Sequence, residues 1–456
     1  MATTDPKHRG TWNSKIGFIL AAAGSAVGLG NIWGFPTQVA DNGGAAFILI
    51  YLICCFIIGF PVMVAELTIG RKTQKNPVGA FKALSNGNPF VPLIGYWGVL
   101  CGVMILSFYV VISGWTLAYV FEELFYFFNY DAAAAYVGDL GNGVKNSIFT
   151  LFFMILTVLV VTGGVSKGIE RATKLLMPVL IGILLILIVY IFTLEGAREG
   201  IVMYFRPDFS TINPDLLLSA MGQAFFSLSL GMGALITYGS YLNKNQNIVE
   251  SAAYVTIFDV GIAVIAGLLV IPAMYVAQAG GVNIMDPVTG ALHSSTTLVF
   301  DVLPEMFHNV GGLIGLLLGV TFFLLLGLAA LTSSISLLEV PVSYVIDEHG
   351  LKRKKAAWIV GGLVGIVSVV VSFELGLIDI FVSIFNEVGL PLGGLMICLF
   401  LGYFWKGENA LLEMENGNEG VSNSSFSKIW IIFIKFISPI LIAIVLFTTI
   451  WGLIKS

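Results

Sequence analysis

The chain contains 456 residues, of which 57% are hydrophobic and only 11% are charged, with a formal net charge of −5. A typical soluble domain carries roughly a quarter charged residues. This composition excludes a soluble enzyme, a disordered regulator and a protein that binds nucleic acids.

The charged residues divide the chain into long uncharged segments. Eleven of these segments have 18 residues or more: 16–40, 42–65, 83–121, 146–166, 175–194, 216–243, 260–285, 306–338, 356–373, 388–405 and 436–454. A helix needs about 20 predominantly apolar residues to cross a hydrocarbon core of about 30 Å. The chain is therefore predicted to be an all-α integral membrane protein with eleven transmembrane helices. Long buried helices of a soluble protein are the alternative, and so many segments in one chain argue against it.

Lysine and arginine are unevenly divided between the two sides of such a bundle. Eighteen of the 22 lie on the side of the N-terminus, and four lie on the other side, namely Lys145, Arg198, Arg206 and Lys455. Loops rich in Lys and Arg remain in the cytoplasm. We therefore expect a multi-pass protein of the cell (inner) membrane with a cytoplasmic N-terminus and an extracytoplasmic C-terminus.

Four connecting segments stand out from the otherwise short loops. Segments 126–144 and 281–305 are predicted to form outer lids, because both contain small amphipathic stretches. The KRKK run at 352–355 is interpreted as an inner loop that only orients the chain. The polar segment 407–427 is expected to be mobile at the inner face.

The first and sixth spans contain clustered glycines. The first includes GSAVGLGN at 24–31, followed by Pro36, and the sixth includes SLSLGMG at 227–233. Each glycine weakens a helix by about 1 kcal/mol relative to alanine, so local unwinding is expected in both, with close helix packing as the alternative. These are the first spans of two successive five-helix units. Interrupted helices in matching positions of two repeats favour a transporter binding site.

The cysteines and histidines indicate neither a disulfide framework nor a metalloenzyme. Cys54, Cys55, Cys101 and Cys398 all lie within apolar segments, as small buried hydrophobes do. The four histidines are scattered along the chain and form no cluster in the sequence. No glycine-rich phosphate loop is present either, so we expect neither an enzyme nor a nucleotide-driven pump.

The glycine-rich segments and four other motifs resemble the neurotransmitter:sodium symporter family. The matching motifs are GSAVGLGNIWGFP (24–36), DNGGAAF (41–47), GWTLAY (114–119), VSKGIERATKLLMP (165–178), QAFFSLSLGMGALITYGSY (223–241) and LTSSISLLE (331–339). Eleven spans are similar to the shorter bacterial amino-acid branch. The resemblance implies sodium-coupled uptake by alternating access, in the inverted-repeat fold of the bacterial leucine transporter, with helices 1 and 6 unwound within the membrane. A single transporter domain is then expected, with repeats at 13–194 and 214–406 and a last helix at 428–455.

The resemblance also implies two sodium sites. Sodium site 1 maps to four residues, namely Ala26, Asn31, Ser227 and Asp259. Sodium site 2 maps to three backbone carbonyls and two hydroxyls, those of Gly24, Val27, Ala329, Thr332 and Ser333. Oxygen ligands of this kind suit a hard cation. Hydroxyls that bond back to their own helix are the alternative for Thr332 and Ser333.

Asp259 is a departure from many relatives, which carry asparagine at this position. One helical turn further on, chloride-dependent relatives carry a serine where this chain has Ala263, whereas the other chloride-site positions, Tyr51, Gln223 and Ser227, are retained. A carboxylate within the membrane is costly unless it is paired. We therefore expect Asp259 to supply a fixed negative charge and transport to need no chloride. A water-exposed Asp259 at a helix end is the alternative.

The substrate site implied by the resemblance combines backbone groups, hydroxyls and an apolar compartment. It maps to Ala26, Leu29, Gly30, Ile105, Tyr109, Phe226, Ser227, Ser229, Met232, Ser334 and Leu337. Relatives that carry monoamines have an aspartate where this chain has Gly28, so the substrate is expected to bring its own carboxylate. An amino acid or related carboxylate with an aliphatic or aromatic side group fits best.

The two gates of the family differ in how well this chain matches them. The outer arginine and aspartate are replaced by Gly34 and Val382, which leaves an amine-free organic acid open as an alternative substrate. The inner gate maps to Arg9, Trp12, Ser240, Tyr241 and Asp347, with an Arg9–Asp347 ion pair sealing the cytoplasmic side. Gly168 and Pro178 match a pattern linked to unwinding of the inner end of helix 5.

A channel and a substrate-sensing receptor on the same scaffold are the competing functional classes. A channel would be expected to show a ring of acidic residues or a repeated filter sequence, and the sequence contains neither. A receptor would be expected to carry a signalling domain, and none is found. The expected partners are a small-molecule substrate, sodium ions and the lipid bilayer, and the chain is expected to be a monomer or a weak oligomer.

Overall fold

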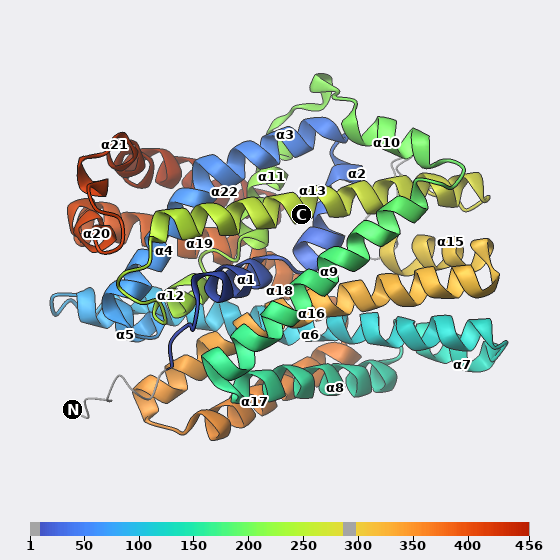
Figure 1. Cartoon of the computed structure of the whole chain (residues 1–456), viewed down its shortest axis with the longest axis horizontal. Helices are drawn as coiled ribbons and strands as arrows, with labels where there is room; N and C mark the ends of the chain where they lie inside the picture. Colours follow the sequence, from blue (N-terminus) through green and yellow to red (C-terminus); the bar gives the residue numbers. More distant parts are fainter. Residues whose placement is uncertain (1–9, 286–297, 456) are drawn as a thin grey trace.

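The computed structural model describes residues 10–285 and 298–455, most of which lie in helices (Figure 1). The α-helices are α1 (Lys15–Ala26), α2 (Phe35–Asp41), α3 (Ala45–Cys54), α4 (Phe60–Thr73), α5 (Pro77–Leu84), α6 (Pro92–Phe127), α7 (Asp131–Gly138), α8 (Gly143–Thr162), α9 (Glu170–Ile191), α10 (Ala197–Phe205), α11 (Pro214–Ser227), α12 (Ala234–Gly239), α13 (Ile248–Ala279), α15 (Leu303–Val310), α16 (Gly312–His349), α17 (Arg353–Phe373), α18 (Gly376–Phe381), α19 (Leu390–Leu399), α20 (Gly407–Met414), α21 (Ser425–Ile432) and α22 (Ser438–Lys455).

Wider π-helical turns interrupt or join several of these helices. They are η2 (Gly30–Gly34), η3 (Cys55–Gly59), η4 (Val165–Ile169), η6 (Leu298–Val302), η7 (Val382–Gly389), η8 (Phe400–Phe404) and η10 (Phe433–Ile437). Two short 3₁₀ turns, η5 (Phe209–Thr211) and η9 (Val421–Asn423), lie in loops. Because η3 joins α3 to α4 without a break, the span Ala45–Thr73 is one continuous helix.

The prediction of an all-helical membrane protein with many spans is confirmed. Within the described residues, nine helices are long and apolar enough to cross a membrane, and α1 with Gly30–Asp41 forms a tenth candidate, bent by 53°. The predicted sixth span contains α11 and α12, which have 14 and 6 residues and are each too short to cross alone. The count of eleven spans therefore stays a prediction.

The outward faces of the long helices are apolar. On α9, Leu175, Ile186 and Val189 are each more than two-thirds exposed, at 67%, 68% and 68%. Large contiguous apolar surfaces are rare on soluble proteins. This surface is instead suited to contact with lipid.

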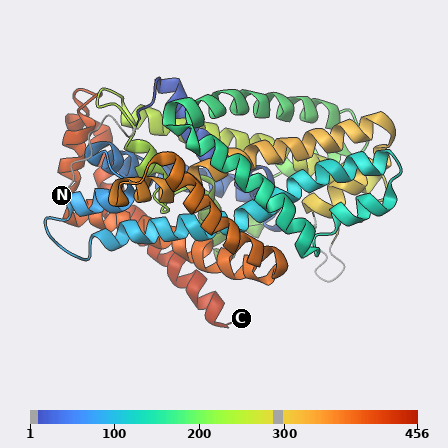
Figure 2. The same ribbon diagram turned by 90° about the horizontal axis from the view of Figure 1, so that it is seen from below.

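The helices bring distant parts of the sequence to two ends of the bundle. Figure 1 shows α5, α12 and α20 at one end of the bundle, here called the amino end. It shows α7, α10 and α15 at the opposite end, here called the far end. Figure 2 shows that the last helix, α22, projects from the bundle. Between the two ends, α1 lies against α9, α13 and α16, and α6 packs along α16.

Both segments predicted to be outer lids contribute helices to the far end. The first of them contains α7, and the second contains η6 and the first turn of α15. Residues 286–297 of the second lid lie outside the described residues. The common position of α7 and α15 agrees with the prediction that these two segments serve the same side.

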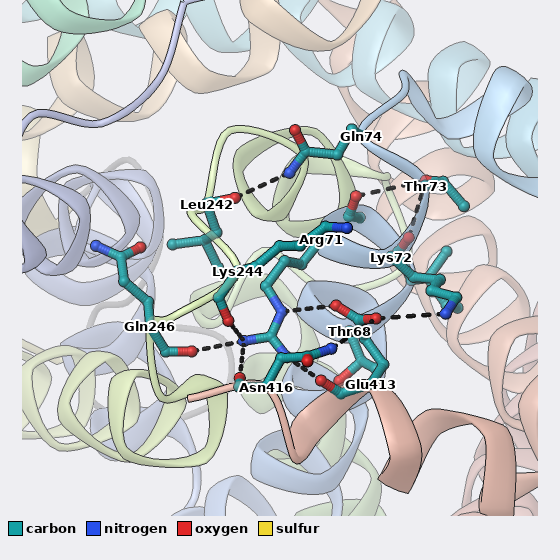
Figure 3. Close-up of polar contacts among 12 residues, drawn as sticks. Thr68, Arg71, Lys72, Thr73, Gln74, Leu242, Lys244, Gln246, Glu413 and Asn416 are labelled. Atoms are coloured by element: carbon teal, nitrogen blue, oxygen red, sulfur yellow. Dashed lines mark hydrogen bonds and ion pairs between the residues drawn. The ribbon is translucent and has the colours of Figure 1, made fainter. Parts of the chain in front are cut away.

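A buried arginine organises the amino end (Figure 3). Arg71 of α4 is fully buried and its Nε lies 3.0 Å from a carboxylate oxygen of Glu413 in α20. Its Nη1 donates to the carbonyl oxygens of Gln246 and Asn416 at 2.5 and 2.8 Å. The prediction of a mobile segment at 407–427 therefore missed α20, which this ion pair and these backbone bonds attach to α4.

Candidate functional site

The two predicted unwound segments are irregular and lie next to each other. Helix α1 ends at Ala26, and Val27 is extended before η2 begins at Gly30. Helix α11 ends at Ser227, and α12 begins only at Ala234. The hydroxyl of Ser229 donates to the carbonyl oxygen of Ser25 at 3.0 Å, which joins the two breaks directly.

Glycine is required in the second break for a definite reason. Gly231 and Gly233 have positive φ angles of +80° and +77°, a conformation that L-residues rarely adopt. A Cβ atom on Gly231 would also collide with the carbonyl oxygen of Leu390 in α19. The glycines therefore unwind this span and allow it to pack closely against α19.

A small cavity, here called the central cavity, lies at the junction of the two breaks. Its lining residues come from both breaks, α6 and α16: Ser25, Ala26, Gly28, Gly30, Ile105, Tyr109, Phe226, Ser229, Met232, Ser333 and Leu337. Its volume is about 20 Å³, so these side chains must move apart to admit a molecule larger than water.

Eight of the eleven residues predicted for the substrate site line this cavity, and three do not. Leu29 lines the larger cavity described below. Ser227 instead bonds to Asp259. The hydroxyl of Ser334 donates to the carbonyl oxygen of Leu331 at 3.0 Å and lies 2.9 Å from Thr157 of α8. Three residues line the cavity although they were not predicted for the substrate site, namely Ser25, Gly28 and Ser333. Ser25 and Gly28 lie within the same glycine-rich motif.

The central cavity has a polar wall formed by the first break. The hydroxyl of Tyr109 accepts a hydrogen bond from the backbone N–H of Leu29 at 3.0 Å. A Cβ atom on Gly28 would lie 2.5 Å from this hydroxyl and would collide with the hydroxyl of Ser333. A longer side chain at Gly28, such as the aspartate of monoamine-carrying relatives, would therefore occupy the cavity itself.

The opposite wall of the cavity is apolar. Ile105 of α6 is fully buried, and Met232 and Leu337 are 3% and 4% exposed. Phe226 lies beside Gly30, where a Cβ atom would be only 3.0 Å from its ring. A ligand with one charged or polar end and one apolar end matches these two walls.

A second, larger cavity, here called the vestibule, shares Tyr109 and Phe226 with the central cavity. Its volume is about 510 Å³. Gly34 and Val382, which replace the outer-gate ion pair of the resembled family, both line it. Tyr109 and Phe226 thus lie between the two cavities.

Five oxygen atoms predicted for sodium site 2 converge between α1 and α16. The hydroxyl of Thr332 lies 2.9 Å from the carbonyl oxygen of Ala329 and 3.3 Å from that of Val27. The hydroxyl of Ser333 lies 3.3 Å from the same Val27 oxygen and 3.5 Å from that of Gly24. The break after α1 therefore directs carbonyl oxygens toward α16 instead of along their own helix.

Asp259 of α13 is fully buried and is hydrogen-bonded to both breaks. One carboxylate oxygen accepts from the amide nitrogen of Asn31 at 2.7 Å, and the other accepts from the hydroxyl of Ser227 at 2.8 Å. The Ser227 oxygen in turn accepts from the Tyr51 hydroxyl at 3.0 Å. The alternative of a water-exposed Asp259 therefore does not hold in this structure.

Within residues 10–285 and 298–455, no cationic side chain balances this carboxylate. Among the described residues, Asp259 forms no ion pair with lysine, arginine or histidine. An uncompensated buried charge is strongly unfavourable. The hydrogen-bond donors to Asp259 in this part of the chain are the neutral side chains of Asn31 and Ser227.

Four of the five predicted inner-gate residues lie at the amino end, and Arg9 lies outside the described residues. Trp12 is buried, and its Nε1 donates to the carbonyl oxygen of Tyr238 at 3.0 Å. Its backbone N–H donates to that of Tyr241 at 3.3 Å. The hydroxyl of Ser240 donates to its own helix, at the carbonyl oxygen of Thr237.

Asp347 lies at the end of α16 and binds the cap of α5. One of its carboxylate oxygens accepts from the backbone N–H of Asn76 at 2.9 Å and from its side-chain amide at 3.0 Å. Asn76 caps α5 with its side-chain oxygen. The predicted Arg9–Asp347 pair stays a prediction.

An ion pair that was not predicted from the sequence lies at the amino end. Arg353 binds the buried carboxylate of Glu339 through two nitrogens at 2.7 and 2.8 Å, and the same carboxylate accepts from the hydroxyl of Tyr241 at 2.6 Å. Arg353 belongs to the basic run that was interpreted only as an orienting loop. The available signal was the glutamate that ends the LTSSISLLE motif, because a carboxylate buried in a membrane span needs a partner.

Comparisons with known proteins agree with this arrangement. A model of the sodium:neurotransmitter symporter family matches residues 9–137 and 126–455. The uncharacterized sodium-dependent transporter YhdH of Bacillus subtilis is 36% identical, over 95% of this chain and 96% of its own. An uncharacterized sodium-dependent transporter of Haemophilus influenzae is 33% identical, over 97% of this chain and 98% of its own.

A solved structure extends the similarity to three dimensions. The crystal structure of MhsT in complex with L-phenylalanine superposes with a TM-score of 0.83 at 41% sequence identity. The superposition covers 97% of this chain and 99% of that chain. Sequence and fold are thus similar over nearly the whole length.

Proposed function

Because this chain belongs to the sodium:neurotransmitter symporter family, we propose that it couples the uptake of an apolar or aromatic amino acid to two sodium ions, without chloride. The family makes the chain a sodium-dependent membrane transporter and not an enzyme. The observation that carries the proposal is the buried Asp259 carboxylate, which contacts both helix breaks and has no cationic partner among the described residues.

Sodium site 1 is supported by this missing counter-charge. A sodium ion at Asn31 and Ser227 would lie beside Asp259 and would neutralise it. Relatives that need chloride bring a mobile anion to this region, whereas here the anion is covalently part of α13. Sodium binding at site 1 then needs no chloride.

Sodium site 2 is supported by the convergence of carbonyl and hydroxyl oxygens between α1 and α16. Oxygen atoms are the ligands that hard cations prefer. The Ser333 hydroxyl points toward carbonyl oxygens of the broken helix. The Thr332 hydroxyl bonds back to Ala329 of its own helix at 2.9 Å and lies 3.3 Å from the Val27 carbonyl oxygen. A sodium ion at this position would attach α1 to α16.

The substrate class follows from the ends of the broken helices and the apolar wall. The positive end of a helix dipole favours anions and the negative end favours cations. The Leu29 N–H of the first break and the Tyr109 hydroxyl of α6 are bonded to each other in this structure, and both could turn to donate to a carboxylate. Helices α1 and α11 both end at the cavity, so the negative ends of their dipoles would favour an ammonium group there. A zwitterionic amino acid therefore fits better than an amine-free acid, and MhsT was crystallised with L-phenylalanine.

The two gates support alternating access between five-helix repeats at 13–194 and 214–406. Tyr109 and Phe226 separate the central cavity from the vestibule, and they would open for entry. Trp12, Tyr241 and the Glu339–Arg353 pair close the amino end, and they would part for release. We assign the amino end to the cytoplasm, because most lysines and arginines of the chain lie on that side.

Uptake into proteoliposomes tests the proposal. We expect radiolabelled L-phenylalanine to accumulate against its gradient when sodium is high outside, with sigmoidal sodium dependence and the same rate when gluconate replaces chloride. Collapse of uptake in gluconate would refute the role given to Asp259. Sodium-dependent binding without flux would identify a receptor, and downhill flux without accumulation would identify a channel. Accumulation of phenylpropionate but not phenylalanine would favour the organic acid.

A further inference from the structure

Three potential metal ligands meet at the far end of the bundle, away from the central cavity. Glu122 and Glu123 come from α6, and His308 comes from α15. The Nε2 atom of His308 lies 3.4 Å from a carboxylate oxygen of Glu123 and 3.6 Å from one of Glu122. One ligand atom from each residue lies within 4.8 Å of the other two.

These groups are buried and incompletely satisfied. Glu123 is only 2% exposed. Within the part of the chain that the structure describes, its Oε1 forms no hydrogen bond, and the Nε2 of His308 meets the two carboxylates only at the long distances given above. Unpaired buried polar atoms are rare in folded proteins, and such an atom indicates a partner from outside the chain, such as an ion. Gly319 of α16 leaves the necessary space, because a Cβ atom there would collide with the Glu123 carboxylate.

The histidine ring is held in place while the site remains accessible. The ring of Tyr126 stacks on that of His308 with centroids 3.5 Å apart and planes 8° from parallel. A cavity of about 370 Å³ is lined by Glu123, Tyr126 and His308 together with residues of α16. An ion could therefore reach ligands whose orientation is already fixed.

We propose that Glu122, Glu123 and His308 bind one Zn²⁺ ion that links α15 to α6. Two carboxylate oxygens and one imidazole nitrogen form a three-residue ligand set that leaves a fourth position for water. Ligands of a tetrahedral Zn²⁺ lie roughly 3.4 Å apart for bonds of about 2.1 Å, and two of the three separations are already close to this. The imidazole favours a transition metal over Ca²⁺ or Mg²⁺, which take oxygen ligands.

The position of the site predicts its effect on transport. The chain segment before α15 is η6, whose Phe300 lies edge-on to Trp33 and Trp115, with ring centroids 6.4 and 5.7 Å away. Both tryptophans line the vestibule. Zn²⁺ would therefore hold the η6–α15 segment against α6 beside the vestibule and slow the movements that admit substrate.

Binding to the purified full-length chain tests the site directly. After treatment with a chelator, we expect isothermal titration calorimetry with ZnCl₂ to give one tight site per chain. His308→Ala should weaken binding by more than about 100-fold, since even changes to second-shell groups cost 10- to 100-fold. His349→Ala, which alters the exposed histidine at the other end of α16, is the matched control and should bind as the wild type does.

Two further variants separate loss of a ligand from loss of structure. His308→Cys supplies another zinc ligand and should retain binding, whereas Glu123→Gln should weaken it. All variants are compared for sodium-dependent thermal stabilisation in the presence of chelator, which identifies any that fail to fold. Wild-type protein without a tight Zn²⁺ site, or equal binding by folded His308→Ala protein, would overturn the proposal and leave His308 as a charge partner of the two glutamates.

Discussion

Replacing Asp259 by asparagine would test the charge on which sodium coupling is proposed to depend. The substitution keeps the shape of the side chain and removes its negative charge. The carboxylate oxygens lie 2.7 and 2.8 Å from the side-chain atoms of Asn31 and Ser227, the residues expected to bind sodium at site 1. A sodium ion there would lie within about 4 Å of the Asp259 charge, since single hydrogen-bond lengths separate these groups.

The magnitude follows from this separation. Two unit charges about 4 Å apart interact by about 4 kcal/mol at an effective dielectric constant near 20. The asparagine dipole would recover part of this, so a loss of about 2–4 kcal/mol is expected, or roughly 30- to 1,000-fold weaker sodium binding. Chloride could then occupy the region of the missing charge and restore part of the affinity.

The assay is sodium-dependent uptake in proteoliposomes, with chloride or gluconate as the only external anion. The Asp259→Asn protein should need far more sodium for half-maximal uptake in gluconate and should be stimulated by chloride. Asp215→Asn, which removes an exposed carboxylate from the first turn of α11, is the matched control and should behave as the wild type. An unchanged sodium requirement of Asp259→Asn in gluconate would refute the reasoning.

Three other substitutions test the remaining parts of the site. Tyr109→Phe removes a hydroxyl at the polar wall. It should raise the substrate KM about tenfold or more, because hydrogen bonds to charged groups contribute about 1.5–3 kcal/mol. An unchanged KM would exclude contact between this hydroxyl and the substrate carboxylate. Thr332→Ala should lower the Hill coefficient for sodium toward one, and an unchanged coefficient would argue against sodium site 2. Arg353→Ala leaves Glu339 buried without its cation and should destabilise the protein by about 3–5 kcal/mol, seen as a lower thermal unfolding temperature, whereas Lys354→Ala in the same basic run should not. Equal unfolding temperatures for these two variants would contradict the proposed ion pair.

The long helices and the two breaks could be predicted from the sequence because both depend on local properties. Uncharged segments long enough to span a bilayer appear directly in the order of residues, and glycine acts on the backbone where it stands. The residues of the GSAVGLGN motif predicted for the cavity also come from one short stretch of chain. Their geometry follows once that stretch unwinds beside α11.

The partners of buried charges could not be predicted in the same way. Arg71 and Glu413 are far apart in the sequence, and Glu413 lies in a polar segment that resembles a loop. Glu122 and His308 meet only because α15 folds back over α6. Such contacts depend on how distant helices pack, which neither periodicity nor composition reveals. The widened π-helical turns were missed for a related reason, since no residue type marks them.

The buried acidic residues differ in what balances their charge, and this difference separates structural from functional groups. Glu413 and Glu339 have arginine partners supplied by the chain, so both ion pairs are complete before any ligand arrives. Glu66 accepts from the backbone N–H of Gly231 at 2.7 Å, close to the start of α12, where the helix dipole favours a negative group. Asp259 has only neutral donors among the described residues. Under the proposed function, sodium at site 1 would supply the counter-charge that Asp259 lacks, and substrate that also contacts this sodium would share the same gain in free energy.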